Sequence, residues 1–403
     1  MTGFSEPHGA IPYSTEVLPP AELNTIVDNS RAQFLRTLGG WTVFSGPYGT
    51  QDSAKLRVPT WVSGWSTLLM CAAAAAADPI LFSLTLNSTT NRYDWLAGTQ
   101  FTALANAENL ILSFVPSTLE LVAFSVISST NYYLVQSSGS SLASFAFDDS
   151  ASFTCKGPIC YAHSETPLDA RWFVPGRKES DYPSVAVVSS AGAAVTLGVS
   201  PNSSGEFMTS IATDGEGLVV AVGGTDAAKA VAVSTDNGDS WTWAAYPTHA
   251  AALTTAHPCV AYDATRELFV TTIIDTSRDF NYCSSPDGTS WGAWHTVPTL
   301  GGSHENLFDV SAQIVIVGGT WIIAQPYHPQ LNGVQLVRVF ASYDGGSSWH
   351  DISPAQNIQL ETTGTDDGFW MVEANGRVVI ATTRWVAVSE PFDSVTPIAS
   401  SLV

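Results

Sequence analysis

Three short stretches of the sequence, each following a β-type run, decide the expected fold. They are Ser234-Thr-Asp-Asn-Gly-Asp-Ser-Trp241, Ser342-Tyr-Asp-Gly-Gly-Ser-Ser-Trp349 and the one-residue-shorter Ser285-Pro-Asp-Gly-Thr-Ser-Trp291. In such a turn an Asp side chain accepts backbone N–H groups, Gly supplies positive φ and Trp packs beneath the turn at the edge of its own sheet. We therefore predict a hairpin at each stretch. The residues with predicted structural roles are Ser234, Asp236, Gly238, Trp241, Ser285, Asp287, Gly288, Trp291, Ser342, Asp344, Gly346 and Trp349.

These stretches resemble the Asp-box (BNR) repeat of sialidases and related β-propellers. Degenerate copies, in which Asp, Gly or Trp is replaced, occur at residues 88–95, 136–142, 200–207 and 389–395. The seven stretches recur about every 50 residues, which matches the length of a four-stranded propeller blade with loop insertions. The sequence therefore predicts an all-β fold, a β-propeller of about seven four-stranded blades, with six blades as the alternative.

Apolar runs between the motifs agree with this fold. Residues 217–224, 268–274, 312–319 and 377–382 are continuous and rich in Val and Ile, as in sheets packed on both faces. Cys71–Asp78 contains six alanines between two strand-like runs, and we interpret it as an inner strand and its turn rather than a helix.

Residues 1–40 do not fit the repeat and are predicted to be a separate segment. Pro7, Pro12 and Pro19-Pro20 favour an extended arm, and Ala21–Leu38 has the apolar stripe of an amphipathic helix. We expect residues 41–403 to form the propeller and residues 1–40 to cap it or to dock onto a larger assembly.

The charge and the N-terminus limit the partners. The net charge is −21, with 15 Lys and Arg against 36 Asp and Glu. Such a chain repels phosphate backbones, so we expect no nucleic-acid partner. The most apolar window, Leu68–Leu86, is broken by Asp78-Pro79 and predicts paired strands, so we expect no membrane insertion. The first residues lack a basic segment followed by an apolar run, and no Sec signal peptide is expected.

The resemblance to sialidases implies an active site, so we looked for its catalytic residues in the sequence. Leu56-Arg57-Val58-Pro59 matches the family's Arg-Ile-Pro type motif, which implies that Arg57 is one of three arginines gripping a sugar carboxylate. Asp78 is the early Asp that the family's chemistry would need. The alternative is a surface Arg before a turn proline and an ordinary Asp-Pro turn. No remaining catalytic residue is singled out among the available side chains. Those are Glu206, Glu267, Glu305, Glu361, Arg266, Arg338, Arg384, Tyr327 and Tyr343.

Metal and cofactor sites are not predicted. The histidines lie singly along the chain, and no dinucleotide, phosphate-loop or calcium-loop motif is present. Cys155 and Cys160, with His163 nearby, leave three alternatives open, namely unpaired thiols, a local disulfide or half a metal site.

Three functions remain. The first is a non-enzymatic structural or recognition module of a larger assembly, most simply a bacteriophage virion (tail or receptor-binding) component, with residues 1–40 contacting other virion proteins. The second is a sialidase-like exo-glycosidase. The third is a secreted propeller that binds a cell-surface glycan. The expected location is the virion for the first and outside the cell for the others.

Overall fold

The computed structural model describes 24 stretches of the chain, and every regular element in them is a β-strand. The stretches are 41–45, 54–56, 60–62, 67–74, 80–87, 92–100, 111–115, 120–127, 130–136, 143–146, 153–155, 160–162, 171–178, 182–189, 195–199, 207–223, 230–244, 258–275, 279–297, 313–327, 335–354, 359–360, 370–382 and 385–392. The arm and helix predicted for residues 1–40, and the candidates Arg57 and Asp78, lie outside these residues.

The described strands form seven antiparallel sheets, which we number I to VII along the chain. Sheet I contains β2 (Ala54–Leu56), β3 (Thr60–Val62), β4 (Thr67–Ala74), β5 (Ile80–Asn87) and β6 (Arg92–Gln100). Sheet II contains β7 (Ile111–Val115), β8 (Glu120–Ile127), β9 (Thr130–Gln136) and β10 (Ala143–Ala146). Sheet III contains β11 (Phe153–Cys155), β12 (Cys160–Ala162), β13 (Arg171–Lys178), β14 (Tyr182–Ser189) and β15 (Val195–Val199).

The remaining sheets repeat the same order. Sheet IV contains β16 (Met208–Thr213), β17 (Val219–Gly223), β18 (Ala230–Ser234) and β19 (Thr242–Ala244). Sheet V contains β20 (Cys259–Asp263), β21 (Leu268–Ile274), β22 (Phe280–Ser285) and β23 (His295–Thr296). Sheet VI contains β24 (Gln313–Val317), β25 (Thr320–Tyr327), β26 (Gln335–Ser342), β27 (His350–Asp351) and β28 (Gln359–Leu360). Sheet VII contains β29 (Trp370–Ala374), β30 (Arg377–Ala381), β31 (Trp385–Ser389) and β1 (Trp41–Ser45).

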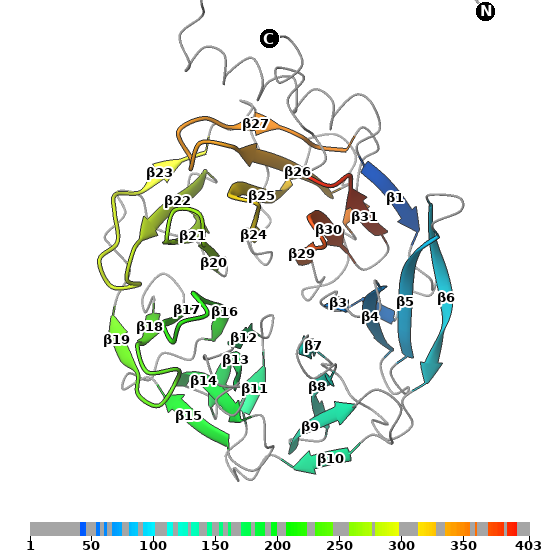
Figure 1. Ribbon diagram of the computed structural model, residues 1–403, viewed down its shortest axis with the longest axis horizontal. Coiled ribbons are helices and arrows are strands. Elements are labelled where there is room, and N and C mark those ends of the chain that lie inside the picture. The colour runs from blue at the N-terminus through cyan, green and yellow to red at the C-terminus, as the bar shows by residue number, and fades with distance from the viewer. Residues whose placement is uncertain are drawn as a thin grey trace, which may run out of the picture.

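The sheets stand around a ring, with the first strand of each sheet nearest the centre and the last at the rim (Figure 1). The inner strands contact one another in an unbroken cycle, from β3 through β7, β12, β16, β20, β24 and β29 back to β3. In sheets I and III two short strands share the inner position, because β2 and β3 both pair with β4, and β11 and β12 both pair with β13. This arrangement confirms the predicted all-β propeller.

The two ends of the propeller meet in sheet VII. The third strand, β31, pairs with β30 on one side and with β1 on the other. The buried Trp41 of β1 donates its indole N–H to the carbonyl oxygen of Ile352 in the neighbouring sheet VI, at 2.7 Å. An N-terminal strand therefore completes the last sheet.

Apolar side chains fill the spaces between neighbouring sheets. All five residues of β17 are buried, as a strand packed on both faces requires. Phe173 and Val187 of sheet III pack against Met208 and Ile211 of sheet IV, and equivalent clusters join sheets IV and V, V and VI, and VI and VII. The first three alanines of the run fall in β4, so the described part of the run is a strand, although the second strand of its sheet rather than the innermost.

Not every predicted turn falls where the repeat placed it. Residues 88–91 and 137–142 connect third and fourth strands as predicted, and residues after Ser389 follow a third strand. Residues 200–207, in contrast, connect β15 of sheet III to β16 of sheet IV, so the prediction of a hairpin there was wrong. The hairpin of sheet III lies at residues 190–194, Ser-Ala-Gly-Ala-Ala, which lack both Asp and Trp. The Ser, Asn and Gly of the connection share the composition of a turn, which explains the error.

Candidate functional site

The antiparallel order gives each sheet two different ends. The turns between first and second strands and between third and fourth strands lie at one end, which we name the turn end; it includes residues 214–218, 235–241, 264–267, 286–294, 318–319, 343–349 and 375–376. The turns between second and third strands, and the connections from sheet to sheet, lie at the opposite end, which we name the link end. Lys178, Gly223, Ile274, Tyr327 and Ala381 are the last residues of their strands at the link end.

The three motifs with which the sequence was analysed form turns at the turn end, and we name them the S-x-D turns (residues 234–241, 285–291 and 342–349). In the first, the Asp236 carboxylate accepts bonds from the Ser234 hydroxyl at 2.8 Å and from the Ser240 N–H at 2.8 Å. The Ser234 hydroxyl in turn accepts the Gly238 N–H at 2.7 Å. The carboxylate therefore holds the turn together from within.

The other two S-x-D turns use the same bonds. Asp287 accepts the Ser285 hydroxyl at 3.0 Å and the Ser290 N–H at 2.6 Å. Asp344 accepts the Ser342 hydroxyl and the Ser348 N–H, both at 2.8 Å. Each of the three Asp carboxylates is therefore saturated by bonds within its own turn.

Hydrogen bonding also lowers the pKa of each carboxylate. The bond from the Ser240 hydroxyl is the largest influence on Asp236 and lowers its pKa below the ordinary 3.8. Burial raises the pKa of Asp287 and Asp344, but bonds from Ser290 and Ser348 outweigh burial and the net direction is downward. The charged form of each Asp is therefore the form that the folded turn prefers.

Each S-x-D turn also rests on the preceding sheet. A Cβ placed on Gly238 would come within 2.6 Å of the Phe173 ring of sheet III, and one on Gly288 within 2.4 Å of Val220 of sheet IV. A Cβ on Gly346 would come within 2.6 Å of the Tyr282 hydroxyl of sheet V, which donates to the Gly346 carbonyl at 2.7 Å. Glycine is required for its positive φ and also for this close approach.

The motif Trp residues take part in the same contacts. Trp241 lies edge-on to Phe173 of sheet III with ring centroids 6.2 Å apart, and Trp349 lies edge-on to Tyr282 of sheet V at 5.6 Å. The sequence predicted that each Trp closes the edge of its own sheet. The structure corrects this, because Trp241 and Trp349 join one sheet to the one before it.

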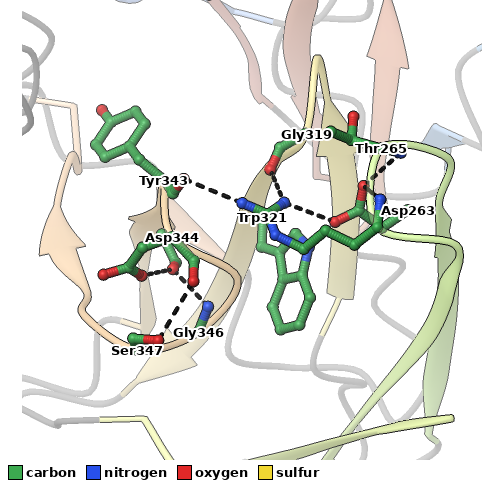
Figure 2. A network of polar contacts seen from close by, with 10 residues as sticks. Asp263, Thr265, Gly319, Trp321, Tyr343, Asp344, Gly346 and Ser347 are labelled. Atoms are coloured by element: carbon green, nitrogen blue, oxygen red, sulfur yellow. Dashed lines mark hydrogen bonds and ion pairs between the residues drawn. The ribbon is translucent and has the colours of Figure 1, made fainter.

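A charged network at the turn end locks sheet V to sheet VI (Figure 2). Asp263, whose side chain is fully buried, accepts the Trp321 indole N–H at 2.5 Å and the Arg266 guanidinium at 2.8 Å. Arg266 continues to the carbonyl oxygens of Gly319 at 2.7 Å and Tyr343 at 3.2 Å. Two turns of sheet VI are thus held by one arginine of sheet V.

Two other arginines at the turn end also donate hydrogen bonds to backbone carbonyl oxygens. Arg171 of sheet III donates to the carbonyl oxygen of Asn237 in sheet IV at 2.9 Å, and Arg377 donates to the carbonyl oxygen of Ser389 at 2.9 Å. Arg266, a candidate for gripping a sugar carboxylate, is therefore occupied by backbone carbonyls. Tyr343 belongs to an S-x-D turn, and Glu267 is exposed in the turn after Asp263. Arg338 lies within β26 and belongs to neither turn.

The structure does not assemble the expected sialidase residues within its described part. Tyr327 is the last residue of β25 at the link end, whereas Arg266, Glu267 and Tyr343 belong to the turn end. The other candidates, Arg57, Asp78, Glu206, Glu305, Glu361 and Arg384, lie outside the described residues.

At the link end, a polar cluster braces the hairpin between β21 and β22. Asp275 accepts the Asp279 N–H at 2.9 Å and the Asn281 amide at 3.0 Å. The Asn281 amide oxygen accepts the Thr296 hydroxyl at 2.8 Å, so three strands of sheet V are tied together. Asp275 and Asn281 are buried, which fixes the base of this hairpin at the end that carries the connections. The sequence analysis missed this cluster, since its residues recur in no motif.

The described residues contain no group of three or more His, Cys, Asp and Glu side chains placed to hold a metal ion. Cys259 and Cys283 are buried free thiols, and burial raises the pKa of both. Cys155 and Cys160 fall in β11 and β12, opposite Gly176 and Phe173 of β13. The part of the chain that the structure covers has no helix long and apolar enough to cross a membrane.

With this geometry established, the fold places the chain among β-propellers, and comparison with solved structures agrees. The BP39L lectin of Burkholderia pseudomallei is similar with a TM-score of 0.62 and 12% identity over 84% of this chain and 96% of the lectin. YCF48 bound to D1 peptide is similar with a TM-score of 0.51 and 11% identity over 87% of this chain and 95% of YCF48. No protein family and no curated protein matches the sequence. At these identities the likeness shows the fold alone.

The saturated S-x-D carboxylates predict a specific loss of stability in acid. The pKa of Asp236, Asp287 and Asp344 lies below 3.8 in the folded state, so their contribution is present above about pH 4 and is lost as the pH falls, because the unfolded chain takes up protons first. Urea unfolding at a series of pH values should show a shallower acid loss in the triple Asp→Asn variant than in wild type. Glu216→Gln removes an exposed carboxylate at the same end and should leave the acid slope unchanged; an equal effect there would contradict the prediction.

The Asp263 network predicts an unequal cost at two equivalent turns. Asp263→Ala leaves the buried Trp321 indole N–H without its acceptor and the half-buried Arg266 guanidinium without its carboxylate, and should lower the free energy of unfolding by about 3–5 kcal/mol. Asp214 occupies the matching turn of sheet IV but accepts only the N–H groups of Glu216 and Leu218 there, so Asp214→Ala should cost about 1 kcal/mol. Chemical denaturation measures both, and equal losses would show that the network adds nothing beyond its turn.

Proposed function

We propose that this chain is a non-enzymatic recognition propeller whose ligand binds at the link end. The observation that carries the proposal is the unequal use of the two ends. At the turn end, Asp236, Asp263, Asp287 and Asp344 are saturated by scaffold bonds, and Arg266 holds the neighbouring sheet. The link end carries the two longest connections between described strands, at residues 245–258 and 297–312. Long connections on a rigid scaffold are where recognition residues concentrate.

The ligand class that we propose is a cell-surface glycan. The support is the likeness to the BP39L lectin, a propeller whose name records carbohydrate binding. A peptide ligand is the alternative that the likeness to YCF48 bound to D1 peptide favours. Both occupants would use the same end of the ring.

The larger assembly that we propose is a bacteriophage virion, in a tail or receptor-binding position. The support comes from the sequence, in which a proline-rich arm and an amphipathic pattern precede the propeller and the net charge is −21. Residues 1–40 lead directly into β1, the strand that completes sheet VII, so a partner holding residues 1–40 would hold the ring at its junction. The alternative location is extracellular, as a free glycan-binding propeller.

Binding without turnover is the expected outcome for glycans. The full chain should bind members of an immobilised glycan panel and should release no fluorophore from a fluorogenic sialoside. A sialidase-like enzyme, which the S-x-D turns and Arg57 would also fit, predicts turnover that Arg57→Ala abolishes. Turnover with that sensitivity would overturn the non-enzymatic proposal, and binding of peptides in place of any glycan would overturn the ligand class.

Deletion of residues 1–40 tests the assembly. If this segment docks the propeller, a chain that begins at residue 41 should keep its thermal unfolding midpoint and its glycan binding but lose co-purification with virus particles. Beginning at residue 41 preserves Trp41 and the β1–β31 pairing. Unchanged co-purification would refute the docking role, and a full-length chain that never co-purifies would refute the virion.

A further inference from the structure

The turn between β29 and β30 of sheet VII consists of two residues, Asn375 and Gly376. Both have positive φ, 54° and 73°, as in the type I′ turn that joins neighbouring antiparallel strands. Ala374 and Arg377 pair with each other on the two sides of this turn. The turn therefore sets the register of both strands, and a change in its backbone affects the pairing directly.

An Asn followed by Gly is open to attack by the next backbone nitrogen on the asparagine side chain, because glycine has no Cβ to shield that nitrogen. The sequence contains three such pairs, and the structure describes two of them, Asn237-Gly238 and Asn375-Gly376. The two Asn residues have nearly the same φ, 55° and 54°. Their surroundings differ, so the chain contains a matched comparison of its own.

The first pair, Asn237-Gly238, is fixed in its S-x-D turn. The Gly238 N–H donates to the buried Ser234 hydroxyl at 2.7 Å. Gly238 also lies so close to sheet III that a Cβ would come within 2.6 Å of the Phe173 ring. The Asn237 carbonyl oxygen accepts Arg171 at 2.9 Å. Attack on the Asn237 side chain therefore requires the turn to leave sheet III first.

The second pair, Asn375-Gly376, is open to solvent. Asn375 is exposed, and its carboxamide has no hydrogen-bond partner within the described part of the chain. The Gly376 N–H donates to one carboxylate oxygen of Glu373 at 2.8 Å, and this bond is exposed as well. A base thus already contacts the proton that must leave before the Gly376 nitrogen can attack.

We propose that Asn375 is a site of spontaneous deamidation, with Glu373 taking the proton from the Gly376 nitrogen. That nitrogen forms a bond to the side-chain carbonyl carbon of Asn375 and closes a cyclic imide. The bond from this carbon to the amide nitrogen breaks, and ammonia leaves with the proton that Glu373 returns. Water then opens the ring at either carbonyl group, which gives aspartate or isoaspartate.

The isoaspartate product changes the main chain of sheet VII. Its backbone runs through the former side chain and is one carbon longer, so the turn can no longer hold Ala374 opposite Arg377. The Gly376 carbonyl oxygen, which accepts the Phe392 N–H at 2.8 Å, moves with the turn. Sheet VII is also where β1 and β31 close the ring. The modification therefore weakens the sheet that joins the two ends of the propeller.

Peptide mapping of the full chain after incubation at mildly alkaline pH tests the site. Mass spectrometry of the peptide containing Asn375 should show conversion of the amide to the acid, as separate aspartate and isoaspartate isomers. The peptide containing Asn237 should convert at least about tenfold more slowly, because its turn must first open. An Asn375 peptide that stays unchanged, or an Asn237 peptide that reacts as fast, would overturn the inference.

Two substitutions test the role of Glu373. Glu373→Gln keeps an oxygen that can accept the Gly376 N–H but removes the base, so deamidation of Asn375 should slow several-fold. Glu390→Gln is the matched control, because Glu390 belongs to the same end of sheet VII and contacts Arg377 at 3.4 Å. The rate in this control should equal the wild-type rate. An unchanged rate in Glu373→Gln, or an equal slowing in both variants, would contradict the role of the Glu373 carboxylate.

Thermal unfolding tests the consequence for sheet VII. Incubated wild type should unfold at a lower temperature than fresh protein, in proportion to its isoaspartate content. Asn375→Gly keeps the positive φ without a side chain that can react, so its incubated and fresh samples should unfold alike. An equal loss of stability in the incubated Asn375→Gly chain would assign the loss to another site and contradict the weakening of sheet VII.

Discussion

The ring depends on the contact between a turn and the sheet before it. At Gly238, Gly288 and Gly346 the backbone of an S-x-D turn comes so close to the preceding sheet that even a methyl group would collide with it. The turn must therefore keep one shape, because its backbone sets the spacing between sheets. The Asp carboxylate supplies that shape through short-range bonds, and the Trp extends the contact. Local turn chemistry thereby determines how sheets IV, V and VI stand against their neighbours.

This division between local and distant contacts explains what the sequence predicted. The bonds that Asp236 accepts from Ser234 and Ser240 span a few residues, so a local motif is enough to suggest them. The Trp241 partner lies in another sheet and could not be predicted from spacing. Residues 200–207 were misplaced for the same reason, since a connection and a turn share Ser, Asn and Gly. The pairing of β1 with β31 joins the residues that are farthest apart in the described chain, so no local pattern could predict it.

The same difference between local and distant contacts applies to the candidate catalytic residues. The resemblance left Arg266 among several available arginines without singling it out, and in the structure Arg266 holds the carbonyls of Gly319 and Tyr343 at the turn end. Residue type alone cannot tell an arginine that binds a ligand from one that binds a backbone. The end of the sheet at which an arginine lies follows from the order of strands in that sheet. The sequence can tell which end of a sheet a residue occupies only when the bounds of the strands are known.

The two ends of the propeller therefore face different constraints. At the turn end, replacing Asp263 or Gly346 disturbs a contact between sheets, and few substitutions can keep that contact. At the link end, the connections begin and end on strands already fixed by the buried clusters between sheets, so their sequences can change at small cost to stability. Between sheets III and IV, Phe173, Trp241 and Arg171 secure the interface from the turn end. At the opposite end of the same interface, the guanidinium of Arg177 stacks on the ring of Phe207, so a contact between the two sheets is made there too.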